Sequence, residues 1–227
     1  MEAIFENKLT VGDGIYTVPD MAKILRLPYS KVNRWLNKYW DDRLGKEFQG
    51  QYSWRVESTR AVGFHTLVEF YVMVQFAEAG VKPNAVLRAH IELGKNFNTI
   101  YPFAKREIIE NIKTDGKKIF FEYDGQSITL DGSKQLNLDF IKLFFKKLEF
   151  DDELLASKLW PVGKEKPIVC DPHHKFGQPT IVGTNIQTEV LYRLFKSNEP
   201  VDFIAGLYDL TEEEVQEAIN FHNPIAA

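Results

Sequence analysis

Six polar or basic side chains between residues 30 and 38 follow a spacing that would gather them on one side of a helix. Lysine and arginine neutralise phosphates, and asparagine and arginine form paired hydrogen bonds with base edges in the major groove. The set therefore predicts binding to double-stranded DNA, although a helix face that is merely solvated has the same composition. Its members are Ser30, Lys31, Asn33, Arg34, Asn37 and Lys38.

Two predicted helices position this set. The first begins after Thr17, a residue type that caps helices, and ends before Pro28 because proline disfavours a helical residue in front of it. The second covers about residues 29–39, so the pair forms a helix-turn-helix whose second helix would enter the groove. The apolar positions that would hold this second helix against a core are Val32, Trp35 and Leu36.

A hairpin is expected directly after these helices. Residues 46–56 alternate on both sides of Gly50, which would place Tyr52, Trp54 and Val56 on one face. A hairpin at this position has the geometry of a wing, from which Arg55 would contact backbone phosphates of the operator. A core-packing hairpin with a solvated Arg55 fits the pattern equally well.

Residues 64–97 predict a pair of helices, the first ending at Gly80 and the second beginning at Pro83. In this order of elements, residues 15–97 resemble the DNA-binding domain of MerR-type regulators. The resemblance implies a winged helix-turn-helix domain, which we assign to residues 1–97. It also implies that the chain binds DNA as a homodimer.

The middle segment, residues 98–160, carries fewer chemical signals. Asp124 and Gly125 form a favoured hairpin turn between alternating residues. A helix is expected after it, with apolar residues at helical spacing. We interpret the segment as an α+β linker that acts as a spacer or a dimerisation region. The apolar positions of the expected helix are Leu138, Ile141, Phe145 and Leu148.

The C-terminal segment, residues 161–227, predicts a β arm followed by three helices. Thr188 would cap the first helix, and Thr211 with Glu214 would form a capping box for the third. The second and third helices have helix-turn-helix spacing, but carboxylates on the third would repel phosphates. A protein partner suits this acidic unit better, although acidic residues also simply favour the start of a helix. The partner contacts that we expect are Tyr208, Glu212, Glu213 and Glu217.

Charge is divided unevenly along the chain, although the total of −4 is ordinary for a protein of 227 residues. Residues 1–95 hold 13 Lys+Arg against 11 Asp+Glu, whereas residues 161–227 hold 5 against 10. A basic end and an acidic end can serve two different partners, a polyanion and a basic protein.

The most specific sequence pattern lies within residues 160–222. It consists of Asp171, Pro172, Phe176, Gly177, Pro179, Gly183, Thr184, Ile186, Thr188 and the ending LTEEEVQEAINF. In this pattern the segment resembles the family named domain of unknown function 433. The resemblance implies an antitoxin of the VapB type that binds a PIN-like nuclease toxin. Asn185 and Gln187 depart from the family pattern, in which arginine and proline often occupy these two places.

Signatures of catalysis are not found in the sequence. It contains no Gly-rich phosphate loop, paired-histidine helix or serine elbow. A catalytic ribonuclease built on the cluster Cys170, Asp171, His173 and His174 is one alternative, but we expect no catalytic residue, metal or cofactor. The single cysteine, the absence of a long apolar run and an N-terminus unlike an export signal predict a cytoplasmic protein without membrane contact.

Together these features predict a mainly α fold with short β-hairpins. Its parts are an N-terminal winged helix-turn-helix, a middle α+β linker, and a C-terminal trihelical helix-turn-helix-like domain with a β arm. The function that they favour is an antitoxin that inhibits a nuclease toxin and represses its own operon. The alternatives are a stand-alone MerR-like regulator that responds to a small effector, and a pure scaffold.

Overall fold

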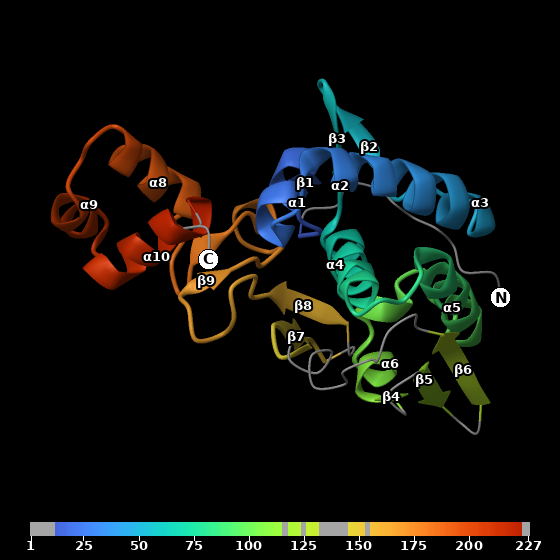
Figure 1. Cartoon of the computed structure of the whole chain (residues 1–227). Helices are drawn as coiled ribbons and strands as arrows, with labels where there is room; N and C mark the ends of the chain where they lie inside the picture. The colour runs from blue at the N-terminus through green and yellow to red at the C-terminus, as the bar shows by residue number, and fades with distance from the viewer. Residues whose placement is uncertain (1–11, 115–117, 124–125, 132–144, 153–154, 224–227) are drawn as a thin grey trace.

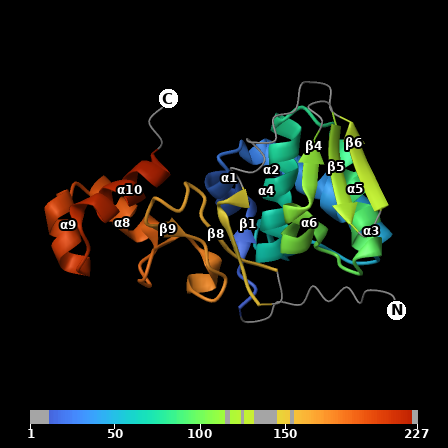
Figure 2. The same ribbon diagram turned by 90° about the horizontal axis from the view of Figure 1, so that it is seen from below.

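The computed structural model describes residues 12–114, 118–123, 126–131, 145–152 and 155–223. These residues are mainly helical with short antiparallel β-hairpins, as the sequence predicts. Figures 1 and 2 show that the three C-terminal helices form one end of the molecule, whereas the middle sheet and helix α5 lie at the other end.

Helix α1 (Val18–Leu25) follows the short strand β1 (Tyr16–Thr17). The Thr17 hydroxyl accepts a hydrogen bond from the Asp20 amide, and Asp20 Oδ2 accepts one from the Thr17 amide at 2.9 Å. This capping box confirms the predicted cap and gives hydrogen-bond partners to two amides at the start of the helix. Arg26 adopts a left-handed conformation that ends α1, and Pro28 precedes the next helix.

The second helix is longer than the sequence pattern predicts. Helix α2 (Tyr29–Trp35) continues through a π-helix, η1 (Leu36–Leu44), into α3 (Gly45–Glu47), so the helical run ends near residue 47 instead of 39. The expected end was wrong because the buried residues recur every four to five positions, which suits the wider π-helical turn. The buried residues of this stretch are Trp35, Leu36, Tyr39, Trp40 and Leu44.

The hairpin predicted at residues 46–56 does not form, because residues 45–47 are helical and the hairpin of this region covers residues 54–62. Strands β2 (Trp54–Val56) and β3 (Thr59–Val62) pair antiparallel, and β1 adds to β3, giving the strand order β1-β3-β2. The turn is at Glu57 and Ser58, with Glu57 at φ 50°, whereas Gly50 closes the end of α3 by donating its amide hydrogen to the Gly45 carbonyl. The prediction of a turn at Gly50 was therefore wrong.

Helix α4 (Phe64–Glu78) is the centre of the core. Eleven of its 15 residues are buried, so it is covered by neighbouring elements around most of its circumference. The Phe70 ring stacks on Trp40 at 4.5 Å between centroids, which joins α4 to the helix-turn-helix. Helix α5 (Pro83–Asn96) packs on α4 as the second member of the predicted pair.

A buried polar contact ties α4 to two other elements. Glu69 is fully buried on α4, and its Oε1 accepts a hydrogen bond from the amide of Phe103 at 2.7 Å. Phe103 belongs to the 3-10 helix η2 (Pro102–Ala104). The Oε2 atom lies 2.7 Å from His90 Nε2 on α5. A buried carboxylate is stable only with such partners, so this cluster fixes how the three elements meet.

The middle segment packs on this core. Helix α6 (Arg106–Glu110) leads into an antiparallel sheet of β4 (Ile112–Thr114), β5 (Lys118–Tyr123) and β6 (Gln126–Asp131). The pairing of Tyr123 with Gln126 confirms the hairpin at residues 124–125. The Phe121 ring lies 5.9 Å from that of Phe103 in a stacked arrangement. Most of the expected helix at residues 138–148 lies outside the described residues, and Leu148, its last apolar position, begins a strand.

That strand, β7 (Leu148–Phe150), pairs with β8 (Ala156–Leu159). The described residues from 161 onwards form the C-terminal unit. Its β arm is the pair β9 (Ile168–Val169) and β10 (Thr180–Ile181), with the 3-10 turn η3 (Lys175–Gly177) between them. The helices α8 (Thr188–Lys196), α9 (Val201–Tyr208) and α10 (Glu212–His222) follow.

Two capping predictions for these helices had different outcomes. The capping box of Thr211 and Glu214 at the start of α10 is confirmed. Thr188 does not cap α8, because it is the first helical residue and its buried hydroxyl donates to the carbonyl of Pro179 at 3.3 Å. The contact holds α8 against the β arm.

Candidate functional site

The residues predicted to bind DNA share the outer side of the α2–η1 helix. Ser30, Arg34, Asn37 and Lys38 are exposed, and Lys31 and Asn33 are half-buried. The Lys31 ammonium lies 4.9 Å from the centre of the Trp35 ring, and that of Lys38 lies 5.4 Å from the centre of the Tyr39 ring. Cation–π contacts of this kind orient a lysine while leaving it accessible to an anion.

Two asparagines on this surface belong to different helical segments. Asn33 lies on α2 and Asn37 on η1, and the Asn37 amide donates to Asn33 Oδ1 at 3.5 Å. Side-chain amides can form two hydrogen bonds with adenine, and this pair lies beside the exposed cations of the same helix side. Tyr29, which the sequence analysis did not select, is 49% exposed at the start of the same helix.

The β2–β3 hairpin rises beside the continuous helical run α2–η1–α3, the long helix, in Figure 1. Arg55 is exposed on β2, directly opposite Arg60 on β3. Arg60 is bound to Asp41 of η1 at 2.7 Å, and Asp41 also accepts hydrogen bonds from the amide and hydroxyl of Ser53. Asp41 therefore fixes the hairpin to the helix, while Arg55 has no ion-pair partner among the described residues.

The four predicted partner contacts in the C-terminal unit differ in their surroundings. Glu212 and Glu213 are exposed in the first turn of α10. Glu217 is bound to Lys166, with 2.6 Å between Oε1 and Nζ, and this hydrogen bond raises the pKa of Lys166. Tyr208 is half-buried and packs against the core. Two of the four residues thus make contacts within the chain.

Exposed apolar side chains on α9 were missed by the sequence analysis. Phe203 is 53% exposed and Leu207 is 57% exposed, whereas their neighbours Ile204 and Ala205 are buried. The periodicity of α9 predicts a helix but does not show which of its apolar residues face the core, because both the buried side and the exposed side of this helix carry apolar residues.

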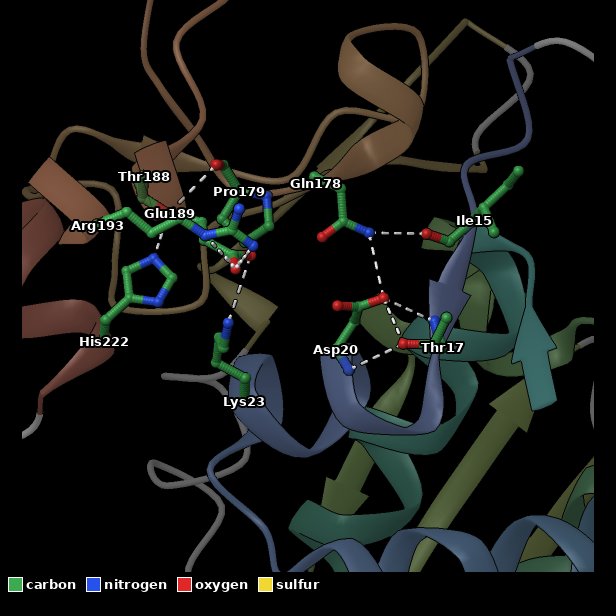
Figure 3. Close-up of polar contacts among 10 residues, drawn as sticks. All are labelled: Ile15, Thr17, Asp20, Lys23, Gln178, Pro179, Thr188, Glu189, Arg193 and His222. Atoms are coloured by element: carbon green, nitrogen blue, oxygen red, sulfur yellow. Dashed lines mark hydrogen bonds and ion pairs between the residues drawn. The ribbon is translucent and has the colours of Figure 1, made fainter. Parts of the chain in front are cut away.

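The C-terminal unit is joined to the N-terminal part of the chain through polar contacts with α1 and with Ile15, just before β1 (Figure 3). The Gln178 amide donates to the carbonyl of Ile15 at 2.9 Å and to Asp20 Oδ2 at 3.4 Å. Lys23 Nζ lies 3.6 Å from Glu189 Oε2 on α8. A cavity of about 180 Å³ lies at this junction, lined by groups of both units that include Asp20, Lys23, Gln187, Glu189 and His222.

His222 is the histidine at the edge of this cavity. Burial and the nearby Lys23 ammonium lower its pKa to about 4, against the opposite effect of Glu189. Its ring stacks on Tyr192 at 5.0 Å between centroids, and Nε2 lies 2.9 Å from the Thr188 hydroxyl. His222 is therefore neutral in the folded chain at physiological pH.

The Gly177 position explains part of the family-like pattern. Gly177 has φ +80°, and a Cβ atom there would overlap the hydroxyl oxygen of Tyr16 and lie 2.6 Å from its Cζ. The amide of Ile15 also donates to the carbonyl of Phe176 at 2.8 Å. Phe176 and Gly177 thus form a close contact between the C-terminal unit and β1.

The side chains around Asp171 make contacts within the chain. Asp171 is buried, accepts a hydrogen bond from the amide of His173, and lies 3.2 Å from His174 Nδ1 and 3.6 Å from Lys158 Nζ. Burial raises the pKa of the neighbouring Cys170 thiol far above its usual range. No group of three His, Cys, Asp or Glu side chains in the described part of the chain is arranged to hold a metal ion.

Comparisons with known proteins place the C-terminal unit and the fold. Residues 168–222 match the model of a family described as protein of unknown function (DUF433), which confirms the resemblance predicted for the C-terminal segment. The uncharacterized protein Rv2308 of Mycobacterium tuberculosis is 26% identical over 216 residues, which are 91% of this chain and 89% of that protein.

The crystal structure of Rv2018, also from Mycobacterium tuberculosis, has a similar fold. Its TM-score is 0.65 at 17% sequence identity, and the match covers 95% of this chain and 99% of that one. At this identity the match shows a shared architecture over nearly the whole chain. Among the described residues, no helix is both long enough and apolar enough to cross a membrane.

Proposed function

We propose that this chain is the antitoxin of a toxin–antitoxin pair, which inhibits a PIN-like nuclease and represses its own operon as a homodimer on operator DNA. The observation that carries the proposal is the separation of charge between the two ends. The exposed cations Arg34, Lys38 and Arg55 surround the helix-turn-helix. Residues 197–227, at the opposite end, contain seven Asp and Glu residues and no Lys or Arg.

The DNA-binding role follows from the geometry of the basic end. Arg34 and Asn37 on the long helix would contact base edges, while Lys38 on the helix and Arg55 on the hairpin would contact phosphates beside the groove. One such domain covers few base pairs, so two chains are needed for a stable complex with an operator.

The inhibitory role follows from the chemistry of a nuclease. An enzyme that cleaves RNA needs a positively charged surface near its active site to hold the phosphates of its substrate. The exposed carboxylates Glu212 and Glu213 would occupy that surface and compete with RNA. The two binding surfaces are far apart in Figure 1, so DNA and nuclease can be bound together.

The nuclease arm of the proposal is tested by inspecting the genes beside that of this chain for a small nuclease and co-expressing the two proteins. We expect the two proteins to co-purify and the RNase activity to fall to background in the complex. A nuclease that stays fully active with an excess of this chain, or a gene with no such neighbour, would contradict the antitoxin role.

The DNA arm is tested by footprinting on the upstream region of the gene. Arg34→Ala and Arg55→Ala should each weaken binding, and Arg55→Ala, which removes a phosphate contact, should also reduce the salt slope of log K by about 1. Arg106→Ala is the matched control, because Arg106 is exposed on α6 and bound to Glu110. Equal affinity and salt slope in all three variants would remove the long helix and the hairpin from the interface.

A stand-alone regulator that responds to a small effector is the second candidate, and the cavity at the junction favours it. The cavity joins α1 of the DNA-binding part to the C-terminal unit, so a ligand there would contact both. This candidate predicts a small molecule that co-purifies with the chain, is detected by mass spectrometry, and changes operator affinity when it is removed. It also predicts that no nuclease is inhibited.

A further inference from the structure

The outer face of α9 is apolar and uncovered within the described residues. Phe203 and Leu207 lie one turn apart on this face, and more than half of each side chain is exposed. Figures 1 and 2 both show α9 at the extreme end of the molecule, away from the core around α4. Two adjacent large apolar residues at such a place indicate a surface that another molecule covers.

A glycine lies between these two residues on the same face. Gly206 is exposed in the middle of α9, and a Cβ atom built there would meet nothing within 4 Å. Glycine is a poorer helix former than alanine, and nothing inside this chain requires it at this position. A glycine on a helix surface does allow another backbone or side chain to approach closely.

The charges around this face identify the kind of partner. Asp202 and Asp209 are exposed on α9 and at its end, and Glu212 and Glu213 follow at the start of α10. Residues 197–227 contain no lysine or arginine. Lys166 of the preceding loop pairs with Glu217 and interacts with Glu213, but no ion pair is found for Asp202, Asp209 or Glu212 among the described residues. An apolar surface surrounded by carboxylates fits a partner whose own apolar surface is surrounded by lysine and arginine.

We propose that Phe203, Gly206 and Leu207 form the docking surface for the nuclease, with the surrounding carboxylates directing its basic surface towards α9. This inference rests on the proposed antitoxin function and assigns its binding surface. Phe203 and Leu207 fill apolar depressions of the partner, and Gly206 lets the partner approach the helix backbone. Tyr208 and Glu217 hold the C-terminal unit together and contribute little to binding.

The test uses the full chain and the nuclease encoded beside its gene, with affinity measured by calorimetry and inhibition measured by RNA cleavage. Phe203→Ala, Leu207→Ala and Gly206→Ala should each weaken nuclease binding at least tenfold. Gly206→Ala is the sharpest variant, because it should weaken binding while raising the melting temperature of the free chain. Tyr29→Ala is the matched control, since Tyr29 is similarly exposed but lies at the start of α2, outside the C-terminal unit.

The outcomes separate this inference from the function on which it rests. If the wild-type chain does not inhibit the nuclease, the antitoxin function fails and the docking surface fails with it. If the wild-type and all three variants bind the nuclease equally, the function stands and the docking surface is overturned. If the variants lose self-association in analytical ultracentrifugation but still bind the nuclease normally, a second copy of this chain covers α9 and the proposal is also overturned.

Discussion

Gly177→Ala is predicted to destabilise the chain by about 2–5 kcal/mol through two separable effects. The backbone at Gly177 has φ +80°, and holding an alanine in the left-handed region costs about 1–2 kcal/mol. The added Cβ also overlaps Tyr16, which is fully buried and cannot move without repacking its surroundings. Overpacking of this kind adds about 1–3 kcal/mol.

Gly183→Ala separates the two effects. Gly183 belongs to the same unit and has φ +73°, but a Cβ atom there would meet nothing within 4 Å. This variant should therefore show the backbone cost alone, about 1–2 kcal/mol. The difference between the two variants in urea denaturation, followed by circular dichroism, measures the contact between Gly177 and Tyr16.

Tyr16→Phe provides a further check of the contact. The Tyr16 hydroxyl is buried without a hydrogen-bond partner among the described residues, so removing it should leave stability unchanged or slightly raised. In that background, Gly177→Ala should cost less, because one of the two overlapping atoms is gone. Equal costs for Gly177→Ala and Gly183→Ala, with no change in the Tyr16→Phe background, would refute this reasoning.

Four further variants test other parts of the structure. Glu69→Leu should cost about 3–5 kcal/mol in urea denaturation, because it leaves His90 and the Phe103 amide without their buried partner. Glu69→Gln retains an acceptor and should cost clearly less, and similar costs for both would contradict this role. Because the pKa of His222 is lowered on folding, the unfolded chain takes up a proton at this histidine at a higher pH than the folded chain does. Neutral His222 therefore makes its full contribution to the free energy of unfolding above about pH 6.5, and this contribution is lost as the pH falls towards 4. His222→Asn should lose that component, which a comparison of the two pH–stability curves would show. Gly206→Ala should stabilise the free chain by about 0.5–1 kcal/mol in the same assay, and a destabilised variant would mean that the helix needs glycine there.

Features that depend on neighbouring residues were predictable from the sequence. The caps at Thr17 and Thr211 were found because a capping box needs only residues three positions apart. The basic side of the long helix was found for the same reason, since helical periodicity fixes which side chains share a side. The hairpin around residues 124–125 also follows from its local turn residues.

Features that depend on distant parts of the chain were missed. The hairpin turn at Glu57 and Ser58 has no glycine to mark it. Gly50 lies instead beside Gly45, where a Cβ atom would come within 2.6 Å of the Gly50 carbonyl oxygen. The π-helix η1 needs the packing of Trp40 on Phe70 of α4, 30 positions away. The exposure of Phe203 could not be inferred, because a lone helix pattern does not reveal which side has a neighbour.

The contacts at the junction also show where a signal between the two charged ends would pass. The pair of Lys23 and Glu189 has side chains that are 38% and 41% exposed, so it is worth at most about 1 kcal/mol. The packing of Gly177 against Tyr16 is fully buried, and the hydrogen bonds of Ile15 with Phe176 and Gln178 adjoin it. Residues 15 and 16 lead directly into α1 and the long helix. These buried contacts would therefore couple the C-terminal unit to the long helix more strongly than the ion pair of Lys23 and Glu189 would.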